Sequence, residues 1–182
     1  MSQRYEIRFS GAGGQGLILA GVIMAEAASI YDGKQAVQSQ SYGPEARGGA
    51  SKSEVVISDS SIDYPKATVV DALLALTQEA ADKYSHDLKE GGVLLIDSDL
   101  VKNIPAGNFN TVAFPIINTA KNDVGREIVA NIVALGAMVA LTGVVTKDSA
   151  EKAVLAHVPE AFTELNRKAF QMGYDKAIAA KA

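Results

Sequence analysis

A glycine-rich segment near the N-terminus has the residue types and spacing of a phosphate-binding loop. It reads Gly11-Ala12-Gly13-Gly14-Gln15-Gly16 and fits the pattern Gly-x-Gly-x-x-Gly between a predicted strand and a predicted helix. Glycines permit a tight turn whose backbone N–H groups point outward, and the N-terminus of the following helix attracts negative charge. The pattern predicts either an anion-binding loop or only a sharp strand-to-helix turn, and these residues alone do not decide between the two.

The side chains that would complete a nucleotide site are absent. In dinucleotide-binding folds an acidic residue about 20 residues beyond the glycines binds the ribose. Here the second predicted strand and its end, residues 35–41, contain no Asp or Glu, and no arginine that could bind a 2′-phosphate occurs between the glycines and Arg47. No Gly-Lys-Ser or Gly-Lys-Thr follows, so the segment is not a Walker loop. Gln15 lies at the mouth of the turn, where its amide can both donate and accept.

A second loop combines glycines with charged and aromatic residues. It reads Ser39-Gln40-Ser41-Tyr42-Gly43-Pro44-Glu45-Ala46-Arg47-Gly48-Gly49-Ala50. Because the carboxyl ends of neighbouring strands in an open α/β sheet lie at one edge, we expect the two loops to face each other. Arg47 can bind a carboxylate or phosphate through two hydrogen bonds, which makes the loop a contact surface. Alternatively, Glu45 pairs with Arg47 and the loop is a structural connection.

Strands and helices alternate along most of the chain. The apolar runs Val69–Leu76 and Val93–Asp97 are typical of strands buried on both faces, and a polar helix is predicted between them at Gln78–Leu88. Further strands are predicted at residues 5–9, 36–40, 52–58 and 111–114, and helices at 17–30, 123–141, from 147 onward and at 160–178. We therefore predict an α/β fold: a three-layer Rossmann-like sandwich with a mostly parallel sheet, forming a single domain over residues 1–182.

Composition excludes several classes of partner. The 182 residues carry a net charge of −4, from 17 basic and 21 acidic side chains without a basic block, so we expect no nucleic-acid binding. The absence of cysteine excludes disulfides and thiolate ligation of zinc or an iron–sulfur cluster. The N-terminal residues have no apolar core of signal-peptide length, which favours a cytoplasmic location. Residues 128–145 predict a buried helix, with a membrane span as a minor alternative.

Three segments together resemble a known family. GAGGQG, the SYGPEARGG stretch and NIVALGA from Asn131 are similar to the gamma component of the 2-oxoacid:ferredoxin oxidoreductases. The resemblance covers nearly the whole chain, and its second motif is the more specific one. It implies that residues 1–182 form a single pyruvate/ketoisovalerate oxidoreductase gamma-type catalytic domain. Within the family the chain looks most like a 2-oxoglutarate enzyme's gamma subunit, while branched-chain, pyruvate and indolepyruvate enzymes stay open. A free-standing Rossmann-like nucleotide-binding module is the alternative from a different class.

The resemblance implies a non-autonomous subunit of an enzyme. The assembly would oxidatively decarboxylate a 2-oxoacid with coenzyme A, giving acyl-CoA, CO2 and reduced ferredoxin. Thiamine diphosphate, Mg, the iron–sulfur clusters and coenzyme A belong to the assembled complex, so this chain alone holds no cofactor and no catalytic residue. Its partners are the other subunits, and ferredoxin through the complex; the isolated chain can form a homodimer. The implied cofactor-facing residues are Gly11, Gly13, Gly14, Gln15, Gly16, Ser41, Tyr42, Gly43, Pro44, Glu45, Arg47, Gly48 and Gly49.

Several other polar residues have plainer interpretations. Asp97 and Asp99 end a buried strand without a partner base, so we interpret them as structural. The two histidines, His86 and His157, belong to no motif and are interpreted in the same way. Asn118 and Asn122 are predicted to cap a helix, with a polar contact to the same cleft as the alternative.

The apolar helix over Arg126–Thr142 is rich in Ala and Gly. We predict that it forms part of an obligate subunit interface together with the helix after the first loop. Asn131 either donates across that interface or bonds within its own helix.

Overall fold

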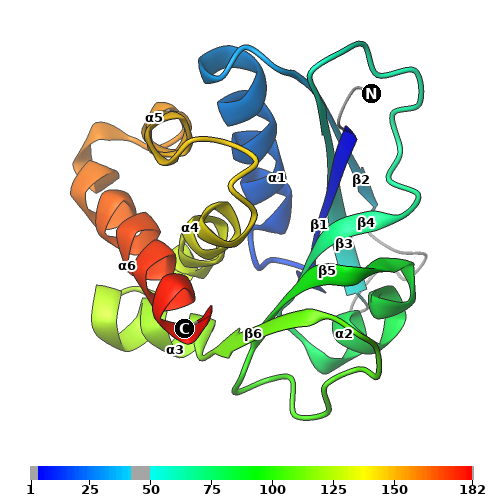
Figure 1. The fold of residues 1–182 in the computed structure, drawn as a ribbon. Helices are drawn as coiled ribbons and strands as arrows, with labels where there is room; N and C mark the ends of the chain where they lie inside the picture. Colours follow the sequence, from blue (N-terminus) through cyan, green and yellow to red (C-terminus); the bar gives the residue numbers. More distant parts are fainter. Residues whose placement is uncertain (1–3, 42–49, 182) are drawn as a thin grey trace.

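The fold is a single α/β unit built on one twisted sheet (Figure 1). A computed structural model describes residues 4–41 and 50–181. The strands are β1 (Arg4–Ala12), β2 (Gln35–Ser41), β3 (Ala50–Ser58), β4 (Val70–Ala75), β5 (Leu88–Asp97) and β6 (Asn110–Phe114). The helices are α1 (Leu17–Glu26), α2 (Gln78–Tyr84), α3 (Ile116–Asn118), α4 (Ala130–Thr142), α5 (Lys147–Ala156) and α6 (Thr163–Lys181).

The strand order places the ends of β1 and β2 at the same edge of the sheet. The order is β2-β3-β1-β4-β5-β6, and β1, β4, β5 and β6 pair in parallel. β3 lies between β1 and β2 and is antiparallel to both, so β2 points in the same direction as β1. The predicted three-layer, mostly parallel sheet is confirmed, and the alternating segment at 52–58 is the return strand of a β2–β3 hairpin.

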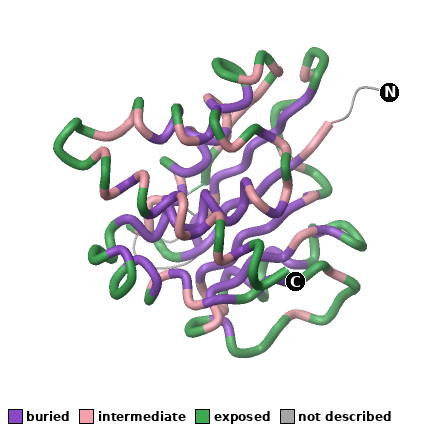
Figure 2. Tube along the Cα trace, turned by 60° about the vertical axis from the view of Figure 1, so that its left-hand side comes forward, coloured by how far each residue is buried: buried purple, intermediate pink, exposed green. Residues whose placement is uncertain are grey.

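The two helical layers are very unequal. Along β4, Ala72 and Leu74 belong to a large core with α1, α4 and α6, whereas Leu73 and Ala75 belong to a small core with α2. Successive strand residues point to opposite faces, so these two cores lie on opposite sides of the sheet. Buried residues, purple in Figure 2, run through the middle of the molecule, and exposed residues lie mostly at its periphery. On the side of the sheet with the small core, buried charged residues of β1 and β3 lie beside the short helix α2.

α4 is the central helix of its own layer, so for α4 itself the predicted subunit interface is wrong. Ala140 and Thr142 are its only residues that are not buried, because α1, α5 and α6 surround it (Figure 1). The apolar stretch that the sequence analysis assigned to another polypeptide is covered by the same chain. None of the helices in the described ranges has the length and apolar character needed to cross a membrane.

Helix boundaries depart from the predictions where glycines and strand pairing intervene. The expected helix at 123–141 is broken at Gly125, whose φ of 107° ends a π-helical segment, Thr119–Val124. A short 3-10 turn, Glu127–Val129, then leads into α4. The predicted helix at 78–88 ends as an α-helix at Tyr84, and Leu88 already begins β5. The predicted helix at 17–30 is confirmed, because α1 passes directly into a π-helical segment, Ala27–Tyr31.

Asp32 joins the end of the first helical segment to the start of α5. Its carboxylate accepts hydrogen bonds from the Thr146 N–H at 2.8 Å, the Thr146 hydroxyl at 3.0 Å and the Ser149 hydroxyl at 2.6 Å. Burial by itself would raise the pKa of Asp32, but these hydrogen bonds and the charge of Lys34 lower that pKa below its usual value. The resulting stability is present above the unfolded-state pKa of about 3.9 and is lost as the pH falls through the folded-state pKa.

Asp32→Asn should therefore destabilise the chain at neutral pH. An amide replaces one acceptor oxygen by a donor, so we expect the free energy of unfolding to fall by about 1–2 kcal/mol at pH 7. The difference from the unchanged chain should shrink as the pH falls through the folded-state pKa. Urea unfolding along a pH series down to pH 2 measures this, with Asp99→Asn at an exposed site as the control. Equal stability of Asp32→Asn and the unchanged chain at pH 7 would contradict the role of these bonds.

Candidate functional site

The first glycine loop is a closed turn between β1 and α1. Gly14 and Gly16 have φ values of 85° and 74°, a backbone region that glycine adopts readily and other residues rarely. The side chain of Gln15 folds back, and its Oε1 accepts the Ala12 N–H at 2.7 Å. One amide that could have faced an anion is thus used inside the loop. Gly13 is more open, since a Cβ added there would meet nothing within 4 Å.

Asn131 at the start of α4 holds the other end of this loop. Its Nδ2 donates to the Gly16 carbonyl at 3.2 Å, and its Oδ1 accepts the Ile132 N–H at 3.0 Å. A Cβ on Gly16 would lie 2.6 Å from that Nδ2, so the positive φ and the close approach both require glycine. The sequence predicted that Asn131 bonds either across a subunit interface or within its own helix. Its side chain instead links α4 to the first loop, in addition to the bond within α4.

The second loop begins and ends beside the first. Ser41 pairs with Lys52, and Ala50 pairs with Ala12, so the residues flanking the loop lie at the edge where β1 ends. The sequence-predicted residues Tyr42, Gly43, Pro44, Glu45, Arg47, Gly48 and Gly49 lie outside the described residues. The described positions agree with the expectation that both loops share one edge of the sheet.

α2 anchors the point where the second loop rejoins the sheet. The Ala50 N–H donates to Glu79 Oε1 at 3.2 Å, and the Tyr84 hydroxyl donates to the Ala50 carbonyl at 3.1 Å. The Ser51 hydroxyl donates to the Gly11 carbonyl at 3.4 Å and so links the two loops. These positioning residues were not predicted from the sequence, because α2 carries no signal beyond its helical pattern.

The strand arrangement disfavours a dinucleotide site. In that fold the strand after the first helix pairs directly with the first strand and brings its terminal acid to the ribose. Here β3 separates β2 from β1, and the end of β2 has no acid. The strand order and the missing acid therefore do not match a dinucleotide-binding site.

Three pockets follow this edge of the sheet. A pocket of about 380 Å³ includes Gly14 and Gly16, and a neighbouring one of about 320 Å³ includes Gly14 and Gln15. A third, also about 320 Å³, lies beyond Ile117 at the end of β5 and includes Asp97. The first loop and the ends of β4 and β5 thus border a row of adjoining pockets.

Three polar side chains of the third pocket, those of Asp97, Asn118 and Asn122, form hydrogen bonds with other residues of its lining. Asp97 is buried and accepts the N–H groups of Asp99 at 2.8 Å and Leu100 at 3.2 Å with one oxygen, and of Ile117 at 2.8 Å with the other. These contacts agree with its structural interpretation. The predicted capping role of Asn118 and Asn122 is wrong: the Asn122 amide donates to the Asn118 side chain one turn earlier, and Pro115 precedes α3.

Comparison with known proteins identifies the family. The family model described as pyruvate ferredoxin/flavodoxin oxidoreductase matches residues 6–176. The chain belongs to this family. It is 54% identical over 179 residues to the 2-oxoglutarate synthase subunit KorC of Methanocaldococcus jannaschii, covering 97% of this chain and 96% of that one.

Two solved structures of the oxidoreductase family share the fold. The keto/oxoacid ferredoxin oxidoreductase gamma subunit of Geobacter sulfurreducens is 81% identical, with a TM-score of 0.93 and 98% of both chains covered. The 2-oxoglutarate:ferredoxin oxidoreductase of Magnetococcus marinus, with 2-oxoglutarate, coenzyme A and succinyl-CoA bound, is 25% identical with a TM-score of 0.86. That match covers 99% of this chain but 32% of the other, so the fold recurs within a longer family chain. The resemblance inferred from the three motifs is confirmed.

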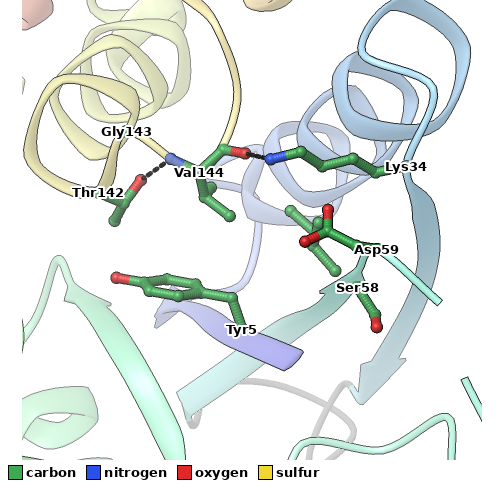
Figure 3. A pocket seen from close by; sticks show the side chains of 8 residues that line it. Tyr5, Lys34, Ser58, Asp59, Thr142, Gly143 and Val144 are labelled. Atoms are coloured by element: carbon green, nitrogen blue, oxygen red, sulfur yellow. Dashed lines mark hydrogen bonds between the residues drawn. The ribbon is translucent and has the colours of Figure 1, made fainter. Parts of the chain in front are cut away.

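A smaller pocket lies at the opposite edge of the sheet in this family member. It has a volume of about 170 Å³ and lies between the start of β1, the end of β3 and the turn after α4 (Figure 3). Lys34 Nζ donates to the Val144 carbonyl at 2.6 Å. Burial, and then the negative charge of Asp71, raise the pKa of Tyr5 to about 12. None of the described residues predicted for the site lines this pocket.

The two histidines remain outside the site. His157 follows α5, and its Nε2 lies 2.7 Å from Glu26 Oε2 at the end of α1. This contact joins two helices and agrees with a structural role. His86 is exposed in a 3-10 turn after α2.

Gln15→Ala should loosen the first loop without unfolding the chain. Losing the acceptor for the Ala12 N–H removes one net hydrogen bond, worth about 1 kcal/mol, so exchange of that amide with solvent should accelerate about fivefold. Hydrogen exchange followed by NMR measures this directly. Gln15→Glu is the control, because it keeps an oxygen at the same position. Identical exchange in Gln15→Ala and the unchanged chain would mean that the side chain does not close the turn.

Proposed function

We propose that this chain is the gamma subunit of a thiamine diphosphate-dependent 2-oxoglutarate:ferredoxin oxidoreductase. The observation that carries the proposal is the 54% identity, over nearly the full length of both chains, to a 2-oxoglutarate synthase subunit. In the proposed reaction 2-oxoglutarate loses CO2, its remaining acyl group joins the sulfur of coenzyme A, and the released electrons pass to ferredoxin. We place the complex in the cytoplasm.

The chain's own residues suit a supporting role in this reaction. It has no cysteine, so the iron–sulfur clusters would be held by thiolates of other subunits. The residues do not fit thiamine diphosphate either, because the chain has no Gly-Asp-Gly signature for the metal-bound diphosphate. When bound by partner subunits, the thiamine cofactor would supply the chemistry that cleaves the bond to the carboxylate.

The edge with the two loops is the part of the chain proposed to face the catalytic subunits. Gly13 has open space around it, and Gly14 and Gly16 allow the backbone to turn tightly. A neighbouring backbone can therefore approach within van der Waals contact where larger side chains would prevent it. We propose that the first loop, together with Ser41 and residues 42–49, contributes to the coenzyme A and cofactor region of the assembled enzyme.

A reconstitution experiment tests the assignment. The isolated chain should give no 2-oxoglutarate-dependent reduction of a viologen dye, whereas adding the other subunits should restore it. Activity should be higher with 2-oxoglutarate than with pyruvate, branched-chain 2-oxoacids or indolepyruvate. Activity of the complex with only one of these other acids would replace the substrate in the proposal. Tight binding of NAD, FAD or ATP to the isolated chain in calorimetry would instead support a nucleotide-binding module.

Arg47→Ala tests the second loop within that complex. If the guanidinium binds an anionic group of coenzyme A, its loss should lower kcat/KM for coenzyme A by about tenfold or more, the effect of one charge-assisted hydrogen bond. Subunit assembly should be unchanged in gel filtration. Arg47→Lys is the matched control, since it keeps the charge but loses the two-pronged geometry and should show a smaller loss. Unchanged kinetics in Arg47→Ala would return the loop to a structural role.

A further inference from the structure

The larger pocket beside the first loop is rimmed by bulky apolar side chains that the fold leaves uncovered. Leu19 of α1, Ile128 before α4 and Phe162 before α6 border it, with exposed fractions of 36%, 82% and 46%. Gly14 and Gly16 of the first loop line it as well. Soluble proteins seldom expose such residues around one hollow unless another molecule covers them. We call this feature the Ile128 pocket.

The position of Ile128 is fixed by its neighbours. Gly125 ends the preceding π-helical segment, and the next turn, Glu127–Val129, leads directly into α4. Val129 is buried, so the turn is pinned to the core on one side of Ile128 and presents the Ile128 side chain on the other. Its exposure therefore belongs to an ordered part of the fold, which lowers the entropic cost of docking a partner there.

The polar groups of the pocket indicate the chemistry of its occupant. Arg126 is the one charged residue among the described residues that line it, and within the described ranges its side chain makes no ion pair or hydrogen bond. Asn166 is buried and donates to the Phe162 carbonyl at 3.0 Å, while its Oδ1 has no partner in the part of the chain that the structure describes. The pocket thus offers an apolar surface, a cation and a hydrogen-bond acceptor.

We propose that the Ile128 pocket docks a segment of another subunit of the same complex, which inserts a bulky apolar side chain and places a carboxylate against Arg126. This inference rests on the proposed function and adds the surface through which the chain assembles. The pocket shares Gly14 and Gly16 with the loop edge that we assign to the catalytic subunits. A second copy of this chain fits less well, because a symmetric contact would bring two Arg126 side chains toward each other and the pocket lining supplies no carboxylate.

Ile128→Asp in the tagged, co-expressed complex is the main test. Because Ile128 is exposed, the variant should unfold at the same temperature as the unchanged chain. Its affinity for the other subunits should fall at least about tenfold, as expected when a central apolar anchor is replaced by a charge. Ile178→Asp is the matched control, since Ile178 is 51% exposed near the end of α6 and outside the pocket. Equal recovery of the partner subunits with Ile128→Asp and Ile178→Asp would overturn the proposal.

Arg126→Glu tests the expected carboxylate. Association with the partner subunits should slow, and the dependence of its rate on salt should weaken or reverse, because a steering attraction becomes a repulsion. Unchanged association at low salt would refute the predicted carboxylate and with it the stated occupant. If Ile128→Asp instead abolished self-association of the isolated chain and left the complex intact, the occupant would be a second copy and the proposal would fail.

These outcomes separate the inference from the function. If the unchanged chain recovers no partner subunits and supports no 2-oxoacid-dependent dye reduction, the proposed function itself fails. If the unchanged complex is active and Ile128→Asp assembles normally, only the docking inference fails. Loss of coenzyme A binding in a normally assembled Ile128→Asp complex would also refute it, because the pocket would then serve a ligand.

Discussion

Gly173→Ala should lower the free energy of unfolding by about 3 kcal/mol or more, which is a large effect for the addition of one methyl group. A Cβ at position 173 would lie 1.8 Å from the Val133 carbonyl oxygen, and one at Gly136 would lie 2.1 Å from the Phe170 carbonyl oxygen. α4 and α6 therefore cross with their backbones in contact, and a methyl group must push the helices apart. The higher helix propensity of alanine, worth about 1 kcal/mol, offsets only part of this cost. Denaturant unfolding of the purified chain measures the difference.

Gly21→Ala in α1 is the matched control. Gly21 is also buried within a helix, but a Cβ there would meet the Ser53 hydroxyl at 2.1 Å, which is part of a side chain that can rotate. Rotation would break the hydrogen bond that Gln38 Nε2 donates to Ser53 at 2.9 Å, so a loss of about 1 kcal/mol is expected. If Gly173→Ala were no less stable than Gly21→Ala, the two helices would not be in backbone contact.

The crossing of α4 and α6 shows why the predicted subunit interface was wrong for α4. The Ala- and Gly-rich composition over residues 126–142 correctly indicated close helix packing, because small residues let backbones approach. It could not show which helix would approach, since Gly136 and Gly173 are separated by the whole of α5 and carry no common motif. The stretch was therefore assigned to a second polypeptide, whereas α6 of the same chain covers it.

The strands of the parallel sheet were predictable because burial on both faces leaves a clear pattern. Continuous apolar runs marked both bounds of β4 to within one residue, and they marked the end of β5 at Asp97. The start of β5 at Leu88 was missed because Lys89, Glu90 and the glycines at 91 and 92 do not look like a strand. Pairing of Val70 with Leu88, across an irregularity before Ala72, extends the strand despite that composition.

The shared edge of the two loops was also predictable, but the contacts that fix it were not. Strand direction alone placed both loops at the carboxyl ends of their strands. The bond from Asn131 to the Gly16 carbonyl joins residues 115 positions apart, and the pairing of Tyr84 and Glu79 with Ala50 depends on where α2 lies. Local sequence patterns therefore reveal the loops, but they do not reveal α2 and α4, the two distant elements that hold them.

Breaking the buried ion pair between Arg8 and Glu54 should have a comparably large effect. Both side chains lie on the thin side of the sheet, with exposed fractions of 2% and 7%, and a guanidinium nitrogen of Arg8 lies 2.7 Å from Glu54 Oε1. Arg8 also contacts Asp87 at 2.5 Å and lies over the ring of Tyr84, the residue that holds Ala50. Arg8→Met leaves the buried Glu54 carboxylate with Lys52 as its one cationic partner among the described residues, so we expect a loss of about 3–5 kcal/mol in denaturant unfolding.

A double-mutant cycle separates the pair from the packing around it. Arg8→Met combined with Glu54→Leu removes both charges, so the double variant should be more stable than the sum of the two single losses predicts, by about 2 kcal/mol or more. Additive losses would mean that Arg8 acts through Asp87 and Tyr84 instead of Glu54. Because Tyr84 connects this cluster to the end of the second loop, Arg8→Met should also speed hydrogen exchange of the Ala50 N–H. Protection of that amide at the level of the unchanged chain would show that the loop edge is held independently of the buried charges.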